Sequence, residues 1–462
     1  MNYVSTRGAA PTLNFCDTLL AGLANDGGLY VPQTWPAVAH GSPDASFAVR
    51  AAQILAPFIG DEISPATLEA LCRQAYGSFR DPLVAPLREM GENRWLLELF
   101  HGPTLAFKDV ALQLIGQLFD HVLQARGERI TVVGATSGDT GSAAIDGVKG
   151  CRNVAMVILY PQGRISEVQR RQMTTVNAAN VHAVAVDGTF DDCQDLVKAM
   201  FNDAPFRAEH HLSAVNSINW ARVMAQVVYY YTAIEQLHAV DSAPVSFSVP
   251  TGNFGNVLAG WIARQLGANV GHLIVGSNSN DILTRFFETQ QMTTAPVVPT
   301  LSPSMDIGVS SNFERLMFEM NGRDGAATAD QIATFRTTGN MAVTADQFGT
   351  WIRPVFRGQR CSDAETTAMI AATYRNHGVL VDPHTAVGLV ATQACATPDE
   401  PVVTLATAHP AKFADAVERA TGVRAELPEH LADLLTRPER FTSVPNDLAA
   451  VQRFVASVSA TR

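Results

Sequence analysis

The chain has 462 residues, with 33 lysines and arginines against 44 aspartates and glutamates, and a formal net charge of −11. This length predicts two or more domains with large cores, and the dispersed negative charge disfavours a nucleic-acid surface. The six cysteines include no CxxC pair and no metal-ligand spacing. We therefore expect reduced core thiols, with no structural metal and no disulfide.

Residues 1–95 predict an N-terminal subdomain that is mainly helical. Helical patterns occur at 47–55 and 64–76, around turns at Asp26-Gly27-Gly28 and Trp35-Pro36. The opening residues lack the basic stretch and apolar segment of a secretory signal, and no apolar run reaches the roughly 18 residues of a membrane span. We expect a cytoplasmic protein without a membrane-spanning segment.

Only four lysines occur in the chain, and Lys108 lies in the unusual run FHGPTLAFKD at residues 100–109. Most cationic residues are arginines, which keep their proton and cannot form an imine, whereas a lysine in an apolar setting can lose its proton. The run therefore indicates that Lys108 is present for the chemistry of its amine and not only for its charge. An ordinary surface ion pair between Lys108 and Asp109 remains open from these residues alone.

A repeated unit begins near residue 130, with a short β-branched run, a loop of small polar residues and then a helical pattern. This alternation predicts a parallel sheet with helical crossovers, in which ligands gather beyond the carboxyl ends of the strands. The expected strand and helix pairs are 130–133 with 142–149, 154–159 with 166–173, 181–186 with 191–201, 245–249 with 256–266, and 402–406 with 411–421.

Two glycine-rich loops join strands to helices. The first, GATSGDTG at 134–141, lacks the GxGxxG spacing of dinucleotide sites. Its hydroxyls and N–H groups suit a carboxylate, or they only cap the next helix. The second, PTGNFGN at 250–256, suits a phosphate, because small residues let the backbone turn closely and the helix start presents N–H groups. An ordinary strand-to-helix turn remains the alternative for this loop.

Two further segments follow in the last third of the chain. Residues 291–345 are rich in Pro, Ser, Thr, Gly and Asn without a strong period, which predicts an insertion in the second sheet region. The run LATAHPAKF at 405–413 follows the last buried strand, and there Thr407 offers either a hydroxyl for a ring nitrogen or a helix cap. An amine, a phosphate loop, a carboxylate loop and this hydroxyl together describe a site for pyridoxal phosphate carrying an amino acid.

Several motifs carry a family resemblance over nearly the whole chain. They are YVSTRG at 3–8, LAGLANDGGLYVP at 20–32, FHGPTLAFKD, ATSGDTG, YPQGRIS at 160–166, NSINWAR at 216–222, PTGNFGN, SPSMDI at 302–307 and TAHPAKF at 407–413. With these motifs the chain closely resembles the threonine synthase family, within the tryptophan-synthase-like, fold type II group of pyridoxal-phosphate enzymes. One departure is Val110, where an aromatic residue is expected, and it touches packing only.

The resemblance implies an α/β fold with two open, mostly parallel sheets and helical crossovers, beside the mainly helical N-terminal subdomain. The catalytic region would then span 96–430, with a smaller α/β part at 96–215 and a larger one at 216–430 that contains the insertion. Residues 431–462 would form a C-terminal helical tail. A monomer or a homodimer is expected.

The resemblance also implies a role for each motif residue. Lys108 would hold pyridoxal phosphate as a Schiff base and, once released by substrate, move protons. The loop Gly252, Asn253, Phe254, Gly255 and Asn256 would hold the cofactor phosphate, and Thr407 would meet the pyridine nitrogen. The residues assigned to the substrate are Thr104, then Ser137, Gly138, Asp139 and Thr140 for its carboxylate, and Arg164, Arg222 and Lys412 as candidate cations for its phosphate. For each cation a structural role is equally open.

The implied activity is that of a carbon–oxygen lyase in threonine biosynthesis, converting O-phospho-L-homoserine and water to L-threonine and orthophosphate. His101 and His409 flank the motifs and are expected to orient backbone and not to titrate. Two alternatives remain. One is another fold type II enzyme, such as a serine/threonine dehydratase or cysteine synthase, and the other is a catalytically idle binding protein descended from this family.

Overall fold

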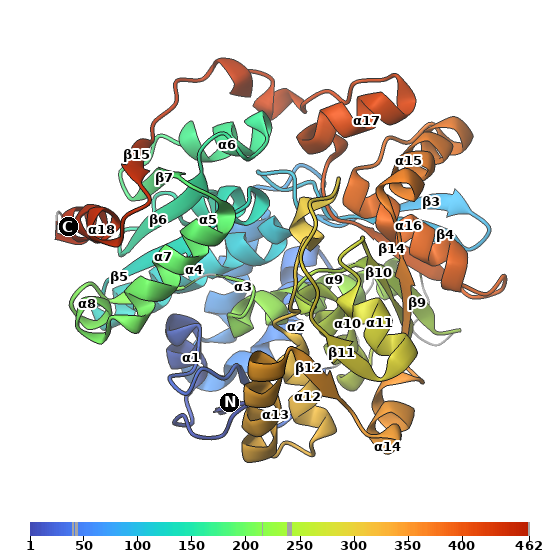
Figure 1. The fold of residues 1–462 in the computed structure, drawn as a ribbon, viewed down its shortest axis with the longest axis horizontal. Coiled ribbons are helices and arrows are strands. Elements are labelled where there is room, and N and C mark those ends of the chain that lie inside the picture. The colour runs from blue at the N-terminus through green and yellow to red at the C-terminus, as the bar shows by residue number, and fades with distance from the viewer. Residues whose placement is uncertain (39–40, 42–44, 215, 238–242, 461–462) are drawn as a thin grey trace.

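The computed structural model describes residues 1–38, 41, 45–214, 216–237 and 243–460. Two open sheets lie side by side, each with helices around it, the five-stranded sheet at the left of Figure 1 and the six-stranded sheet at the right. This arrangement confirms the prediction of an α/β fold with two mostly parallel sheets. The predicted boundary at residue 215 falls outside the described residues.

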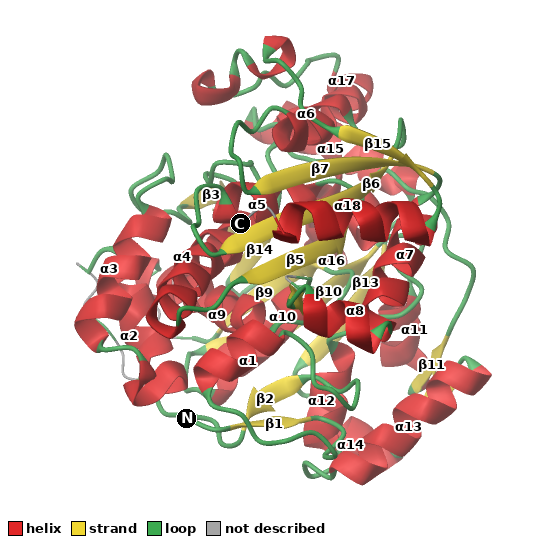
Figure 2. Cartoon of the chain, turned by 90° about the vertical axis from the view of Figure 1, so that its left-hand side faces the viewer, coloured by secondary structure: helices red, strands yellow, loops and turns green. Residues whose placement is uncertain are grey.

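The five-stranded sheet is parallel throughout, with strand order β15-β7-β6-β5-β8. All eight residues of β6 are buried, because helices cover the sheet, so the strand reads as a continuous apolar run. Figure 2 turns this side toward the viewer, with α7 and α18 in front of the strands. The strands are β5 Ile130–Ala135, β6 Val154–Pro161, β7 Val181–Asp187, β8 Leu212–Ser213 and β15 Thr442–Pro445. The helices are α4 Lys108–Arg126, α5 Asp139–Val148, α6 Glu167–Thr174, α7 Phe190–Asn202, α8 Ala204–Glu209 and α18 Leu448–Ala460.

The six-stranded sheet has the order β13-β10-β9-β14-β4-β3, and within it only β3 runs antiparallel to its neighbour. Helix α16 packs on β9, β10, β13 and β14. The strands are β3 Leu87–Gly91, β4 Arg94–Glu98, β9 Val245–Pro250, β10 Val270–Ser277, β13 Phe356–Arg360 and β14 Val402–Ala406. The helices are α9 Trp220–Gln236, α10 Gly255–Gln265, α11 Ile282–Thr289, α15 Asp363–His377, α16 Pro383–Cys395 and α17 Ala414–Thr421.

The N-terminal part is mainly helical, with a small antiparallel sheet of β1 and β2. Its elements are β1 Tyr3–Ser5, α1 Phe15–Ala21, β2 Tyr30–Pro32, α2 Phe47–Ile59 and α3 Pro65–Tyr76. The predicted boundary after residue 95 falls inside β4, which pairs with β14 in the large sheet. Composition could not indicate this, because the partner strand lies some 300 residues further along the chain.

The insertion at 291–345 contains two helices that its sequence pattern does not indicate. Its elements are β11 Gln291–Thr293, α12 Phe313–Met320, α13 Gly325–Thr338 and β12 Asn340–Ala342, and α14 Ala345–Gln347 follows. Helix α13 buries only Thr328 and Phe335, so it shows no clear apolar stripe. The insertion also contacts the N-terminal part, where Arg7 forms an ion pair of 2.8 Å with Glu314.

The C-terminal tail is not purely helical. Strand β15 adds an edge strand to the five-stranded sheet, and α18 packs beside it on β6. Helix α18 buries Val451, Val455 and Val458 against the five-stranded sheet. The tail therefore completes the core of this sheet.

Each of the six cysteines is free, and all are buried except Cys395, which is partly exposed. Across the described part of the chain, no group of three His, Cys, Asp or Glu side chains is arranged to hold a metal ion. Among the same residues, no helix combines the length and apolar character that crossing a bilayer requires.

Candidate active site

Lys108 is the first residue of α4 and lies against the segment that follows β14. The Phe107 N–H donates to the Thr407 carbonyl at 2.9 Å, and the His409 N–H donates to the Leu105 carbonyl at 3.0 Å. Leu105 takes a left-handed conformation with φ of 64°, which turns the chain sharply before the helix. Two sequence motifs separated by almost 300 residues are therefore joined, with Lys108 next to their contact.

The Lys108 ammonium lies in a buried polar cluster and not on the surface. Its Nζ is 3.5 Å from Asp139 Oδ2 and 3.2 Å from Ser304 Oγ. Asp139 also binds Lys412, whose Nζ is 2.8 Å from Asp139 Oδ1 and donates to the Thr104 carbonyl at 2.8 Å. The exposed fraction is 8% for Lys108, 4% for Asp139 and 1% for Lys412. A surface ion pair between Lys108 and Asp109 is therefore excluded.

Burial lowers the pKa of Lys108 to about 8, from 10.5. Asp139 opposes this shift, while the charges of Lys412 and Arg222 add to it. Burial alone would raise the pKa of Asp139, but the charges of Lys412 and Lys108 hold it well below its usual range. The site thus contains an ionised carboxylate beside an amine that can lose its proton near neutral pH.

Asp139 is held in place by the glycine loop after β5. Helix α5 begins at Asp139, three residues before the predicted start, and the Thr136 hydroxyl accepts the N–H groups of Gly138 and Gly141. Gln169 of α6 donates to Asp139 Oδ1 at 2.9 Å. Gly138 has φ of 139°, and a Cβ there would lie 2.4 Å from the Gln169 side chain, so glycine is required.

The second glycine loop leads from β9 into α10. Phe254 is left-handed, with φ of 62°, and α10 begins at Gly255 with a turn whose N–H groups lack intrahelical partners. The Asn256 side-chain nitrogen is buried without a hydrogen-bond partner among the described residues, while its oxygen accepts from Tyr230 at 3.0 Å. Donors at a helix start, including one buried and unsatisfied, fit a phosphate group.

This loop is close to Lys108 through Ser304. A Cβ added at Gly252 would lie 2.8 Å from the Ser304 carbonyl, and Ser304 contacts Lys108 through its hydroxyl. Thr407, which is 5% exposed, follows β14 and accepts the N–H of Phe107, the residue before Lys108. The Lys108 amine, the glycine loop at 252–256 and Thr407 thus come from motifs that meet in the fold, and this arrangement fits an aldehyde cofactor that carries a phosphate.

The three predicted cations are placed differently. Lys412 belongs to the buried cluster, and Arg222 of α9 is 3% exposed with a charge that acts on Lys108. Burial lowers the pKa of Arg222 to about 10. Arg164 is exposed, and its charge helps to lower the pKa of Asp192, near the start of α7. The structure therefore brings Arg222 and Lys412 to the site and leaves Arg164 outside the cluster.

Thr104 faces Asp109, as its N–H and hydroxyl both donate to the Asp109 carboxylate, at 2.8 Å and 2.6 Å. Burial raises the pKa of Asp109 to about 7, although these hydrogen bonds oppose the shift.

His409 accepts the Ala411 N–H, and burial lowers the pKa of His409 to about 4, consistent with a histidine that orients backbone. His101 lies 2.8 Å from Glu98.

Three residues of the cluster had no role in the sequence prediction: Ser304, His384 and Gln169. Ser304 belongs to the SPSMDI motif, which marks the family resemblance without indicating a contact with Lys108. His384 follows Asp382-Pro383, a helix-start signal that explains capping only. Their place in the site depends on tertiary contacts that spacing does not reveal.

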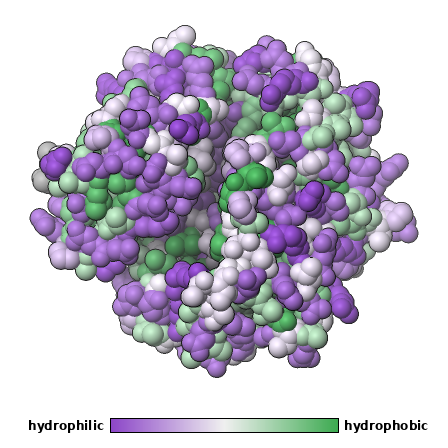
Figure 3. Space-filling model, viewed as in Figure 1, coloured by the Kyte–Doolittle hydropathy of each residue, from purple (hydrophilic) through white to green (hydrophobic). Residues whose placement is uncertain are grey.

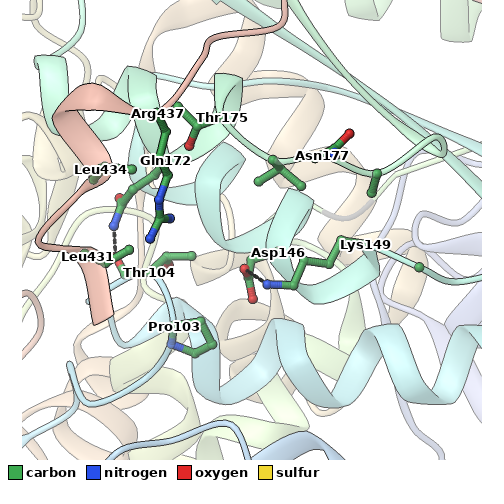
Figure 4. A pocket seen from close by; sticks show the side chains of 13 residues that line it. Pro103, Thr104, Asp146, Lys149, Gln172, Thr175, Asn177, Leu431, Leu434 and Arg437 are labelled. Atoms are coloured by element: carbon green, nitrogen blue, oxygen red, sulfur yellow. Dashed lines mark hydrogen bonds and ion pairs between the residues drawn. The ribbon is translucent and has the colours of Figure 1, made fainter. Parts of the chain in front are cut away.

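A hollow runs between the two halves of the molecule in Figure 3. A separate cavity of about 440 Å³ is lined by Thr104 among other residues, and Lys108 is not one of them. Figure 4 shows Gln172 in its wall donating to the Thr104 carbonyl, with Lys149 beside Asp146 across the cavity. This cavity adjoins the cluster through Thr104 without forming part of it.

Three protein-family models match the chain. They are "Threonine synthase N terminus" at residues 2–76, "Pyridoxal-phosphate dependent enzyme" at 81–408 and "Threonine synthase, C-terminal" at 385–455. A threonine synthase of Pseudomonas aeruginosa is 52% identical, with 99% of this chain and 98% of that protein covered.

Solved structures give the same result. The pyridoxal-phosphate-bound threonine synthase of Brucella melitensis superposes with a TM-score of 0.96 at 50% identity, covering 99% of each chain. The yeast threonine synthase reaches a TM-score of 0.93 at 39% identity, covering 100% of this chain and 99% of its own. The chain therefore belongs to the threonine synthase family of pyridoxal-phosphate-dependent enzymes.

Proposed function

We propose that this enzyme converts O-phospho-L-homoserine and water to L-threonine and orthophosphate, with Lys108 as its covalent attachment point for pyridoxal phosphate. The observation that carries the proposal is the buried Lys108 amine beside Asp139, with its pKa lowered to about 8 by burial. An amine of this kind is unprotonated often enough at neutral pH to form an imine and to act as a base.

The other predicted residues take the following roles in the proposal. Pyridoxal phosphate, when bound, supplies the electron sink that makes the hydrogens of the substrate acidic. The loop Gly252–Asn256 holds its phosphate at the start of α10, and Thr407 offers a hydroxyl to its ring nitrogen. Because a hydroxyl cannot keep that nitrogen protonated as a carboxylate would, it moderates the electron withdrawal.

Lys108 moves the protons of the reaction. Its amine takes the proton from the substrate Cα, then assists removal of one from Cβ as the Cγ–oxygen bond to phosphate breaks, and later returns a proton at Cγ. Water adds its oxygen at Cβ and a proton returns at Cα, so the products are threonine and orthophosphate. Asp139 supports this work because, being ionised, it can receive the ammonium form of Lys108 through their 3.5 Å contact.

Substrate anions need cations, and an acidic chain must supply them locally. We assign Arg222 and Lys412 to this task, since both are buried within reach of the Lys108 charge. The residues 137–140 receive the substrate carboxylate in this proposal, through hydroxyl and N–H groups at the start of α5. Thr104 acts indirectly, since its hydroxyl holds Asp109 and its carbonyl holds Lys412. The predicted domain limits, the cytoplasmic location and the monomeric or homodimeric state stay predictions.

A direct assay tests the proposed function. The enzyme is supplied with O-phospho-L-homoserine, and orthophosphate and threonine are measured together. In parallel it is supplied with serine or threonine, and pyruvate or 2-oxobutanoate is measured. Equal yields of phosphate and threonine support the proposal, whereas oxo-acid formation as the main activity, or no turnover of phosphohomoserine, contradicts it.

A further inference from the structure

Ser304 lies between the two charged groups of the active-site cluster. It belongs to the 3₁₀ turn Pro303–Met305, and its hydroxyl oxygen is 3.2 Å from Lys108 Nζ and 3.3 Å from Asp139 Oδ2. A hydroxyl can accept one hydrogen bond while donating another. Ser304 therefore accepts from the Lys108 ammonium and donates to Asp139, which closes a triangle of three polar groups.

The backbone of Ser304 is held by His384. The Ser304 N–H donates to His384 Nε2 at 3.2 Å, and His384 Nδ1 is 2.6 Å from Asp382 Oδ2. Asp382 is fully buried and His384 is 4% exposed. Because the Ser304 N–H donates to Nε2, that nitrogen is the acceptor of the ring, and the N–H on Nδ1 faces Asp382.

The imidazole and the turn are both fixed by their surroundings. Asp382 caps α16 by accepting the N–H groups of His384 and Thr385, and the His384 ring packs edge-on against Phe413. On the other side of the turn, the Asn278 side chain donates to Ser302 Oγ at 3.0 Å. The turn thus has little freedom to move Ser304 away from Lys108 while these contacts persist.

We propose that His384 is a positioning residue, which acts through the amide of Ser304 to hold the Ser304 hydroxyl against the Lys108 amine as its second hydrogen-bond partner beside Asp139. The inference rests on the proposed function of Lys108 as the base. Ser304 accepts a hydrogen bond from the protonated Lys108 amine and so holds it in position while it carries a proton from one substrate carbon to another. His384 contributes through its position, as the acceptor of the Ser304 N–H.

The contribution of Ser304 has a predictable sign. A hydroxyl that accepts from the ammonium stabilises the charged form, so its removal should lower the pKa of the amine further below 8. The groups that face the amine are Asp139 of α5, Lys412 after β14, Arg222 of α9 and Ser304 itself. None of these other charges changes in a Ser304→Ala variant.

Four proteins test the proposal: Ser304→Ala, His384→Leu, His384→Gln and the double variant Ser304→Ala/His384→Leu. Glutamine places a carbonyl oxygen near the site of Nε2 and can still accept the Ser304 N–H, whereas leucine cannot. The readouts are kcat and KM for phosphohomoserine from pH 6 to 10, and the rate at which cofactor-free protein forms its covalent link to pyridoxal phosphate over the same range. The second readout reports the amine without requiring turnover.

The proposal predicts that Ser304→Ala and His384→Leu each lower kcat several-fold, leave KM nearly unchanged, and shift the apparent pKa of link formation down by about half a unit to one unit. His384→Gln should stay close to wild type, and the double variant should be no worse than Ser304→Ala alone. Ser304→Ala removes only one oxygen, so it remains informative if His384→Leu does not fold.

Two results would overturn the inference. One is a Ser304→Ala enzyme with wild-type kcat and an unchanged pH profile of link formation. The other is an additive loss in the double variant, because His384 would then act independently of Ser304. Both are read in enzyme whose wild type turns over phosphohomoserine, so failure of the proposed function itself would be seen separately, as an inactive wild type.

Discussion

Lys412 and Asp139 form a buried ion pair between the two sheets, with Lys412 Nζ 2.8 Å from Asp139 Oδ1. Asp139 follows β5 of the five-stranded sheet and Lys412 follows β14 of the six-stranded sheet. The carboxyl ends of parallel strands are where open α/β sheets bind ligands, and here the ends of two sheets face each other. The pair therefore joins the two halves of the site and sets the charge that Lys108 meets.

Replacing Asp139 by asparagine should destabilise the protein strongly. The change leaves Lys412 and Lys108 buried without their carboxylate, and breaking a buried pair in this way costs about 3–5 kcal/mol. Denaturant unfolding measures the loss. The control is Asp195→Asn, in an exposed pair with Lys198, where a change within about 0.5 kcal/mol is expected. Equal stability of the two variants would contradict the importance of the pair.

Covalent attachment of pyridoxal phosphate should depend on pH as an amine of pKa about 8 requires. Below pH 8 the rate should fall about tenfold for each unit of pH, since only the unprotonated amine reacts, and above pH 8 it should level off. Absorbance after mixing cofactor-free protein with the aldehyde follows the reaction. A rate that still rises between pH 9 and 10.5 would mean that Lys108 behaves as an ordinary exposed lysine.

The same pKa predicts a change in the stability of the cofactor-free protein. Burial lowers the folded-state pKa of Lys108 from 10.5 to about 8, so the unfolded chain binds more protons between these values. The free energy of unfolding contributed by this group therefore increases by up to about 3 kcal/mol as pH rises from 8 to 10.5, and this gain is lost again as pH falls from 10.5 to 8. The difference between wild type and Lys108→Met should show this increase, and a difference independent of pH would exclude it.

Gly252→Ala should weaken cofactor binding. The new Cβ would lie 2.8 Å from the Ser304 carbonyl oxygen and 3.2 Å from Met305 Cα, both backbone atoms, so either the glycine loop or the turn at 303–305 must shift. We expect the dissociation constant of pyridoxal phosphate to rise about tenfold or more, as for other overpacked sites. Gly349→Ala is the control, since nothing lies within 4 Å of a Cβ there. Unchanged binding by both variants would argue against the phosphate loop.

Arg222 and Arg164 should respond differently to replacement by glutamine. Arg222 is buried and its charge lowers the pKa of Lys108, whereas Arg164 is exposed and its charge lowers the pKa of Asp192. Loss of a charged contact to the substrate should raise KM for phosphohomoserine about tenfold or more in Arg222→Gln, with little change in Arg164→Gln. Steady-state kinetics decides the matter. A larger effect at Arg164 would reverse the assignment.

The buried strands and the loops that follow them could be predicted from the sequence, because each depends on residues close together in the chain. Continuous apolar runs such as β6 indicated parallel strands covered on both faces, and clusters of glycine with small polar residues, such as the run at 134–141, indicated the loops at the strand ends. Because the chain has only four lysines, Lys108 and Lys412 stand out in the sequence as candidate functional amines.

Long-range contacts explain what the sequence did not indicate. Strand β4 pairs with β14, and β15 pairs with β7 in the five-stranded sheet, so each pair joins segments that lie hundreds of residues apart. Composition cannot show such pairs, and the division predicted at residue 95 therefore falls inside β4. Helix α13 buries too few side chains to show a period. Ser304 and His384 reach Lys108 through backbone and side-chain contacts that no spacing rule records.

Reductive trapping tests the central claim most directly. The holoenzyme is treated with borohydride, digested, and its labelled peptide is identified by mass spectrometry. The account predicts a single pyridoxyl label on Lys108, in the peptide containing Ala106-Phe107-Lys108-Asp109, and neither label nor turnover in Lys108→Ala. A label on Lys149, Lys198 or Lys412, or full turnover by the alanine variant, would contradict it.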